Sequence, residues 1–210
     1  TLSSSSAASD VYKRQIGLET TMLTAQEALI QLQEGNQRFV EGKSTRNTNY
    51  AQRRNELVDG QTPFAIILGF SDSRVPTEIV FDQGLGDLFV IRIAGNIVAP
   101  SQIGSIEFAV ETFQTPLVVV LGHTGCGAVA ATLNQIRQPQ ASRSQHLRSI
   151  VERIRPAVEP LTEIRTNLAY EHLLERAIRS NVRMSVNQLR HGSSFFEDMY
   201  DSGDLLIGGA

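Results

Sequence analysis

Three short apolar runs, separated by helical patterns, constrain the fold of this chain more than any other feature. They cover Phe64–Leu68, Leu88–Ile93 and Leu117–Leu121, and each is nearly continuous in Val, Ile, Leu and Phe. Such runs are typical of parallel strands that are covered on both faces. Residues 104–113 and 167–190 carry apolar side chains at helical spacing. The alternation predicts an α/β fold with a mainly parallel β-sheet flanked by helices.

An amphipathic helix is expected before the sheet. The sequence Thr24-Ala25-Gln26-Glu27 matches a capping box, and apolar residues follow on one helical face to about Val40. The polar segment 41–50 then separates this helix from the first strand, so we expect an N-terminal helical arm. A last strand is expected in 204–209.

The length of 210 residues and the composition, 41% hydrophobic and 20% charged, are typical of one globular domain. Residues 1–21 are rich in serine and lack an apolar segment of signal-peptide type. We expect them to be a non-native or disordered leader. Residues 22–210 are then expected to form a single domain.

The charge balance excludes several classes of partner. The net charge is −3, so no basic surface indicates nucleic acid or an anionic membrane, and no apolar run reaches the length of a transmembrane helix. A single cysteine, Cys126, excludes an internal disulfide and indicates a reducing, cytoplasmic location. It also excludes any zinc site that takes two thiolates from one chain.

Polar motifs follow the first and third strands directly. The second of them, GHTGCG, places His123 and Cys126 two residues apart in a Gly-rich turn that leads into a helix. An imidazole and a thiolate at this spacing can face one Zn²⁺, and the helix N-terminus would favour the thiolate. A buried cysteine beside a hydrogen-bonded histidine is the alternative interpretation.

The first motif, SDSR, contains an aspartate and an arginine two residues apart. A turn can bring Asp72 and Arg74 into a charge-assisted pair, which lowers the pKa of the aspartate. Asp72 would then be a hydrogen-bond acceptor that orients a metal-bound water, or a metal ligand if the pair opens. The alternative is a structural ion pair before the helix that begins near Pro76.

Together these motifs resemble those of the β-class carbonic anhydrases. The resemblance runs in order through SDSRVP, DQGLGDLFVIRIAGNIV and GHTGCGAV, and covers about Leu23 to Ala210. The late stretches NVRMSVNQLRHGS and DLLIGGA also resemble that family. The chain stops before the family's usual C-terminal segment, so a C-terminal truncation is expected.

The resemblance implies reversible hydration of CO₂ to bicarbonate by a zinc-bound hydroxide. It implies Asp72, His123 and Cys126 as zinc ligands, with Asp72 and Arg74 as the catalytic pair. It also implies that Gln61 contacts substrate across a dimer interface and that Phe89 lines the CO₂ pocket. From the residues alone, Gln61 is equally a turn residue and Phe89 a core residue.

The same resemblance implies self-association. In this family the N-terminal helix embraces a neighbouring subunit, and the active sites lie at the interface. The predicted N-terminal arm fits that role. We therefore expect a homodimer or a dimer of dimers.

One residue departs from the family pattern: Phe70 occupies the position of the first cysteine ligand. A phenyl ring cannot bind zinc, and losing one of four ligands costs on the order of 3 kcal/mol, about a hundredfold in affinity. Either three protein ligands and a water hold the metal, or no zinc binds and the Asp72–Arg74 pair closes.

The functional expectation is accordingly a carbonic anhydrase-like lyase with a weakened zinc site. The alternative is a non-catalytic homologue that binds bicarbonate or acts as a regulatory or structural subunit. A third possibility is a hydrolase that acts on a sulfur analogue of CO₂.

Overall fold

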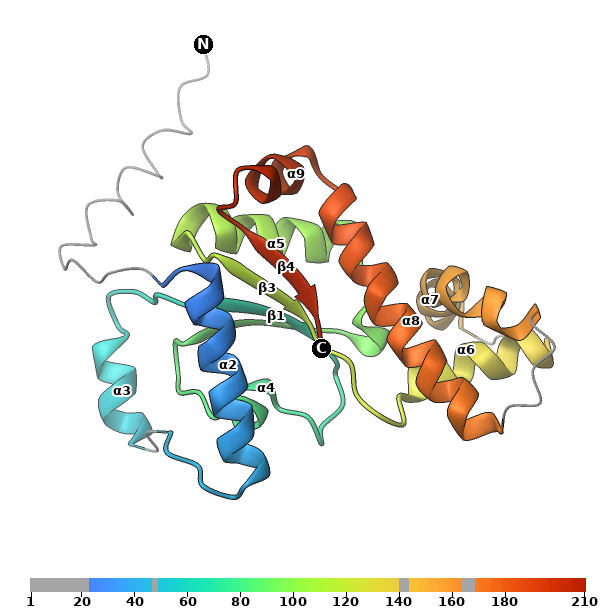
Figure 1. Ribbon diagram of the computed structural model, residues 1–210, viewed down its shortest axis with the longest axis horizontal. Helices are drawn as coiled ribbons and strands as arrows, with labels where there is room; N and C mark the ends of the chain where they lie inside the picture. The colour runs from blue at the N-terminus through green and yellow to red at the C-terminus, as the bar shows by residue number, and fades with distance from the viewer. Residues whose placement is uncertain (1–22, 47–48, 140–143, 164–168) are drawn as a thin grey trace, which may run out of the picture.

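The computed structural model describes residues 23–46, 49–139, 144–163 and 169–210. Its centre is a four-stranded sheet in the order β2-β1-β3-β4, and all of its strand pairs are parallel (Figure 1). This confirms the predicted α/β architecture. The strands are β1 (Ala65–Gly69), β2 (Leu88–Arg92), β3 (Leu117–Val120) and β4 (Leu206–Gly209).

The two central strands are buried along their whole length, as their apolar runs predict. In the register of the sheet, Ile66 of β1 lies beside Phe89 of β2 and Val118 of β3. Because these strands are parallel neighbours, the loops that follow β1 and β3 emerge at the same edge. This edge carries both polar motifs.

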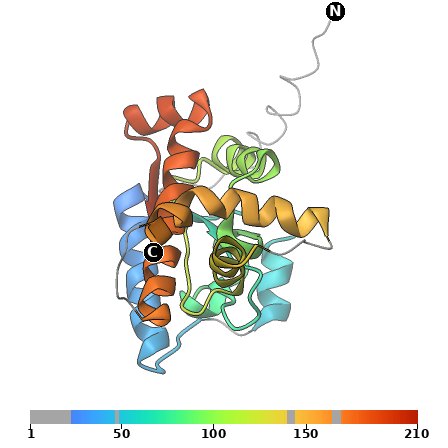
Figure 2. The ribbon, with the colours of Figure 1, turned by 90° about the vertical axis from the view of Figure 1, so that its right-hand side faces the viewer.

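Helices cover both faces of the sheet and the end of its strands. One face packs against α5, α8 and α9, and the other packs against α2. Helices α6 and α7 lie beyond the carboxyl ends of the strands, on the side that faces the viewer in Figure 2. The helices are α2 (Ala25–Val40), α3 (Tyr50–Glu56), α4 (Thr77–Val80), the 3₁₀ turn η1 (Ala94–Asn96), α5 (Pro100–Phe113), α6 (Gly127–Arg137), α7 (Gln145–Glu163), α8 (Tyr170–His191) and α9 (Ser194–Asp201).

The N-terminal helix α2 begins with the predicted capping box. The Thr24 hydroxyl accepts a hydrogen bond from the backbone N–H of Glu27, and the Thr24 backbone N–H donates to the Glu27 carboxylate. Further along, α2 approaches the end of α4 so closely that a Cβ on Gly35 would lie 1.8 Å from the carbonyl oxygen of Phe81. Apolar side chains of α2 also pack in one cluster with those of β1 and β3, so in the single chain α2 lies against its own sheet. Its contact with a neighbouring subunit stays a prediction.

A buried carboxylate fixes the segment that follows α2. Asp82 accepts hydrogen bonds from Arg38 Nε (2.6 Å), from the Ser44 hydroxyl, and from the backbone N–H groups of Thr45 and Arg46. Burial works to raise the pKa of Asp82, but these donors together hold it well below its usual range. The start of the polar linker is thus tied to the body of the domain.

Two predictions concern the limits of the described residues. The expected leader, 1–21, lies outside them. The long helix predicted over 167–190 is α8, which begins at Tyr170 and ends at His191 in the described part of the chain.

No helix among the described residues is both long and apolar enough to cross a membrane.

Candidate active site at the carboxyl end of the sheet

The loops that follow β1 and β3 meet beyond the sheet. The first contains Phe70, Asp72 and Arg74, and the second contains His123 and Cys126. Gly125 has a φ of +66°, a conformation that glycine adopts without strain, and it turns the second loop into α6. Adjacent parallel strands thus bring together residues that are about fifty positions apart in the sequence.

Asp72 and Arg74 form the predicted charge-assisted pair. Arg74 donates from Nε to Asp72 Oδ1 (2.9 Å) and from Nη2 to Oδ2 (2.7 Å), and its backbone N–H also donates to Oδ1. Hydrogen bonds from the Arg74 side chain, and then from its backbone, hold the pKa of Asp72 well below its usual range. At neutral pH Asp72 is therefore ionised, and its carboxylate is held in one orientation in which it can only accept hydrogen bonds.

His123 lies beside this pair with its ring orientation fixed. Its Nδ1 is 2.9 Å from the carbonyl oxygen of Thr124, which can only accept, so Nδ1 carries a hydrogen. Its Nε2 faces Asp72 Oδ2 at 3.8 Å, too far for a direct hydrogen bond. A backbone carbonyl on one ring nitrogen is also the usual partner of a metal-binding histidine.

Phe70 occupies a core position between the two loops. Only 3% of it is exposed, and it packs in one apolar cluster with Ile97, Cys126, Val129 and Ile154. Its ring meets the His123 ring edge-on. The benzyl side chain is thus part of the packed core beneath the loops.

Cys126 is the N-cap residue of α6 and is buried. Burial raises the pKa of its thiol. The backbone N–H groups of Val129 and Ala128 lower this pKa by a smaller amount, and the charge of Asp72 raises it further. The helix N-terminus thus acts on the pKa of this thiol in the expected direction, but burial outweighs it and the net shift is upward.

The expected ligands share a loop cluster, yet they are not arranged around a common point. Within the described ranges, no three His, Cys, Asp or Glu side chains lie close enough to hold one metal ion. Both oxygens of Asp72 accept from Arg74, and the ring of Phe70 lies against His123. As they lie, the side chains do not fit a zinc ion.

Arg92, at the end of β2, is a site residue that the sequence analysis missed. Its Nε donates to the carbonyl oxygen of Phe70 (2.8 Å), and its Nη2 donates to the carbonyl oxygen of Asp72 (2.7 Å). One guanidinium group thus fixes the backbone on both sides of Ser71. The sequence did offer one indication of this role: Arg92 is a charged residue within the apolar run of the second predicted strand, close to the edge that carries the two motifs.

Gln61 and Phe89 are not brought to this edge within one chain. Gln61 is exposed and precedes β1, so the length of that strand, roughly 16 Å, separates it from Asp72. Phe89 lies in the first half of β2, and its ring contacts those of Phe108 and Phe113. Their roles in substrate binding therefore stay predictions that require a second subunit.

Comparisons with known proteins agree with this architecture. A family model described as carbonic anhydrase matches residues 65–210. A carbonic anhydrase of Mycolicibacterium smegmatis is 46% identical over 127 residues, which are 60% of this chain and 61% of that protein. Carbonic anhydrase 2 of Mycobacterium tuberculosis is 47% identical over 127 residues, which are also 60% of this chain and 61% of that protein. The chain thus spans about six tenths of the length of these curated relatives.

Solved structures show the same fold. The β-carbonic anhydrase CcaA superposes with a TM-score of 0.67 at 26% identity, over 86% of this chain and 81% of that one. The β-carbonic anhydrase CafA of Aspergillus fumigatus gives a TM-score of 0.65 at 27% identity, over 84% and 82%. The sheet is parallel, the two motif loops meet at one edge, and the family model matches most of the chain. This chain therefore belongs to the β-class carbonic anhydrase family.

Proposed function

We propose that this chain acts on the CO₂/bicarbonate pair, as a carbonic anhydrase that catalyses reversible hydration of CO₂. Family membership supports the reaction class. The observation that carries the proposal is the Asp72–Arg74 pair, held 3.8 Å from His123 Nε2 at the edge where parallel sheets bind ligands. These residues and Cys126 are the positions at which the chain matches the family's site.

The retained residues can hold a water molecule and a bicarbonate ion. Asp72 is ionised and fixed, and His123 has its hydrogen on Nδ1, so Oδ2 and Nε2 are two acceptors that can share the hydrogens of one water molecule. The side chain of Arg74 is 71% exposed, and its remaining N–H groups can donate to the oxygens of bicarbonate. Arg92 keeps the loop that carries Asp72 in place.

The proposed activity is weak because zinc is the family's catalytic metal and Phe70 replaces one of its ligands. Zinc supplies a metal-bound hydroxide to carbonic anhydrases. In this chain His123 and Cys126 remain as donors, with Asp72 as a third if its pair with Arg74 opens. The phenyl ring adds no ligand at the vacated position and packs against His123 instead.

A second candidate function is bicarbonate binding without turnover, in a regulatory or structural subunit. The burial of Phe70 favours it, because the ring is an integral part of the apolar cluster and the described residues contain no three-ligand metal group. The exposed N–H groups of Arg74 would still bind the anion.

The arrangement of the sheet also supports self-association as a homodimer or a dimer of dimers. Phe89 of the edge strand β2 forms an aromatic cluster with Phe108 and Phe113 of α5, and Phe108 is 51% exposed. Sedimentation velocity with Phe108→Glu would test this, since loss of the oligomer is the expected result.

The test of the function measures zinc and catalysis on the same preparation. Dialysed protein is analysed for zinc per subunit by elemental analysis, and its CO₂ hydration is followed by stopped flow. Close to one zinc per subunit, together with hydration that a chelator removes, supports the enzyme. No zinc after supply in excess, no hydration, and saturable broadening of the ¹³C resonance of bicarbonate support the second candidate instead.

A further inference from the structure

The segment around the 3₁₀ turn η1 contacts both motif loops of the candidate active site. It follows β2, and the backbone N–H of Ile93 donates to the carbonyl oxygen of Gly69 (3.0 Å), one residue before Phe70. Ile97, which ends the turn, packs in the same apolar cluster as Phe70 and Cys126. The place of η1 therefore affects the place of both loops.

The backbone of η1 takes a conformation that few residues adopt. Gly95 and Asn96 both have positive φ, +74° and +41°. Glycine adopts such angles without strain, whereas an asparagine in this region is uncommon and depends on the contacts that surround it. A Cβ on Gly95 would lie 2.5 Å from Ile154 Cδ1 and 3.3 Å from the Cβ of Ala128, two residues after Cys126. The turn is thus packed tightly against the start of α6.

Two polar residues of α8 hold η1 in this conformation. Asn181 Nδ2 donates to the carbonyl oxygen of Gly95 (2.8 Å) and to Asn96 Oδ1 (2.7 Å), which uses both of its hydrogens. About one helical turn later, the Ser185 hydroxyl donates to the carbonyl oxygen of Asn96 (3.0 Å). Asn96, Asn181 and Ser185 are each at most 2% exposed. They form a buried polar cluster between α8 and η1.

Asn181 and Ser185 interrupt the apolar face of α8. The other buried positions of this helix carry apolar side chains: Leu173, Ala177, Ile178, Val182 and Leu189. A buried amide or hydroxyl costs free energy unless it is hydrogen-bonded, and here every donated bond goes to η1. Polar groups at these two positions therefore indicate that their role is to fix η1 rather than to bury apolar area.

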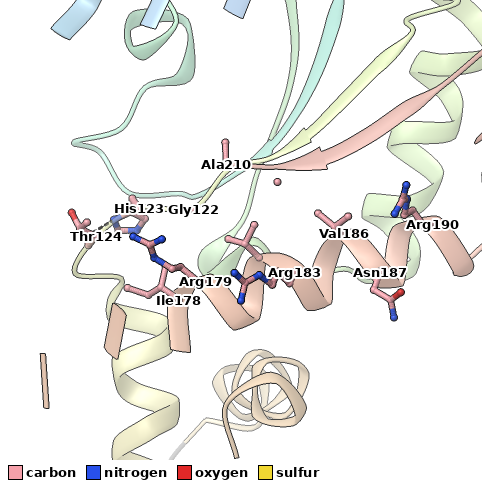
Figure 3. A pocket seen from close by; sticks show the side chains of 12 residues that line it. Gly122, His123, Thr124, Ile178, Arg179, Arg183, Val186, Asn187, Arg190 and Ala210 are labelled. Atoms are coloured by element: carbon pink, nitrogen blue, oxygen red, sulfur yellow. Dashed lines mark hydrogen bonds between the residues drawn. The ribbon is translucent and has the colours of Figure 1, made fainter. Parts of the chain in front are cut away.

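The same stretch of α8 contacts the second motif loop. A Cβ on Gly122, the residue before His123, would lie 2.8 Å from Val182 Cγ2. Figure 3 shows α8 passing beside the loop that carries His123 and Thr124. Because Asn181 and Val182 are neighbours in sequence, one turn of α8 contacts both η1 and this loop. The helix thus places the two motif loops relative to each other.

We propose that Asn181 is a positioning residue of the active site and that Ser185 assists it. The two residues hold η1 in its left-handed conformation, and η1 in turn holds the loop that begins at Phe70 against the start of α6. Both side chains are buried and act through η1 rather than on the substrate. This role rests on the proposed function only where bicarbonate is concerned, because the placement of the loops can be measured without substrate.

The experiment compares Asn181→Leu and Ser185→Ala with the parent in the full chain. The control is Asn187→Leu, which makes the same change at an exposed position of the same helix. Cys126, the single cysteine and only 1% exposed, reports the placement of the loops through its rate of alkylation by iodoacetamide. The rate is measured at several urea concentrations below the unfolding transition, because local opening exposes little surface and responds little to urea. A titration followed by ¹³C NMR measures the affinity for bicarbonate.

We expect Asn181→Leu to raise the urea-independent alkylation rate by about tenfold and to weaken bicarbonate binding by about tenfold. Ser185→Ala removes one of the three hydrogen bonds and should change both quantities in the same direction by about threefold. The control should stay within about twofold of the parent. If Asn181→Leu does not fold, Ser185→Ala decides the outcome.

A role in stability alone would lower the urea midpoint of the variants and leave the alkylation rate of the folded protein unchanged, which would overturn the proposal. An equal rise in the control would overturn it too, as would an unchanged affinity in variants of a parent that binds bicarbonate. A parent that neither binds bicarbonate nor hydrates CO₂ would contradict the proposed function instead. The alkylation rates would then decide alone whether Asn181 positions the loops.

Discussion

The ring of Phe70 stands edge-on to the imidazole of His123, with centroids 4.3 Å apart and planes at 87°. An edge-to-face pair of this kind contributes about 0.5–1.5 kcal/mol beyond the burial of its area. The position at which the family resemblance implies a thiolate ligand therefore holds a stabilising packing contact. Core packing thus occupies a position at which the resemblance implies a donor atom.

Replacing Phe70 by cysteine should restore the missing ligand. For Phe70→Cys we expect zinc affinity to rise by about a hundredfold and CO₂ hydration to rise with it. Zinc per subunit and stopped-flow hydration rates measure both effects. Phe70→Ala is the control, since it removes the ring without adding a donor. An equal gain in the control would show that the ring acts only as a steric block, and no gain in Phe70→Cys would show that the site has diverged beyond this residue.

Arg92 should be needed to position the loop that carries Asp72. Arg92→Lys keeps the charge but loses the planar fork that reaches both carbonyl oxygens, so we expect weaker bicarbonate binding and a loss of about 1 kcal/mol in the free energy of unfolding. A bicarbonate titration followed by ¹³C NMR measures the affinity, and urea denaturation measures the free energy of unfolding. Arg176→Lys on α8 is the matched control. If both variants bind bicarbonate like the parent, Arg92 has no positioning role.

The close approach of α2 to the end of α4 should make Gly35 intolerant of a side chain. Gly35→Ala places a Cβ against the Phe81 carbonyl oxygen, and we expect a loss of roughly 2 kcal/mol in the free energy of unfolding. Gly104→Ala, in an exposed position of α5 with no atom near its Cβ, should instead stabilise by roughly 0.5–1 kcal/mol. Urea denaturation compares the two. A neutral Gly35→Ala would mean that α2 does not approach the end of α4 this closely in solution.

Asp82 should make the stability of the domain sensitive to acid. Its folded-state pKa is lowered, so the stability it contributes is present above its unfolded-state pKa of about 3.9 and is lost as the pH falls through the folded-state value. We expect Asp82→Asn to lower the free energy of unfolding by roughly 2–3 kcal/mol at pH 7, and by progressively less at acid pH.

Denaturation curves from pH 7 to pH 3, compared with those of the parent, isolate this contribution from that of the other carboxylates. Asp59→Asn, an exposed change of the same kind, should leave the curves unchanged. A difference between Asp82→Asn and the parent that does not depend on pH would show that Asp82 acts without its charge.

The elements of the fold follow from local sequence patterns. Buried parallel strands must be apolar on both faces, so Phe64–Leu68 and Leu117–Leu121 predicted β1 and β3 to within a residue. The capping box at Thr24 defined the start of α2. Because parallel neighbours end at one edge, the pairing of Asp72 with Arg74 and its place beside His123 could also be anticipated.

The sequence by itself thus determined the strands, the helices and the edge at which the polar motifs meet, since burial periodicity and short turns are local properties. Only the tertiary structure decided how the side chains there contact one another. Long-range packing put the Phe70 ring against His123, buried the Cys126 thiol and brought Arg92 across from a neighbouring strand. The environment of each group depends on segments far away in the chain, and such contacts leave no periodic signal in the sequence.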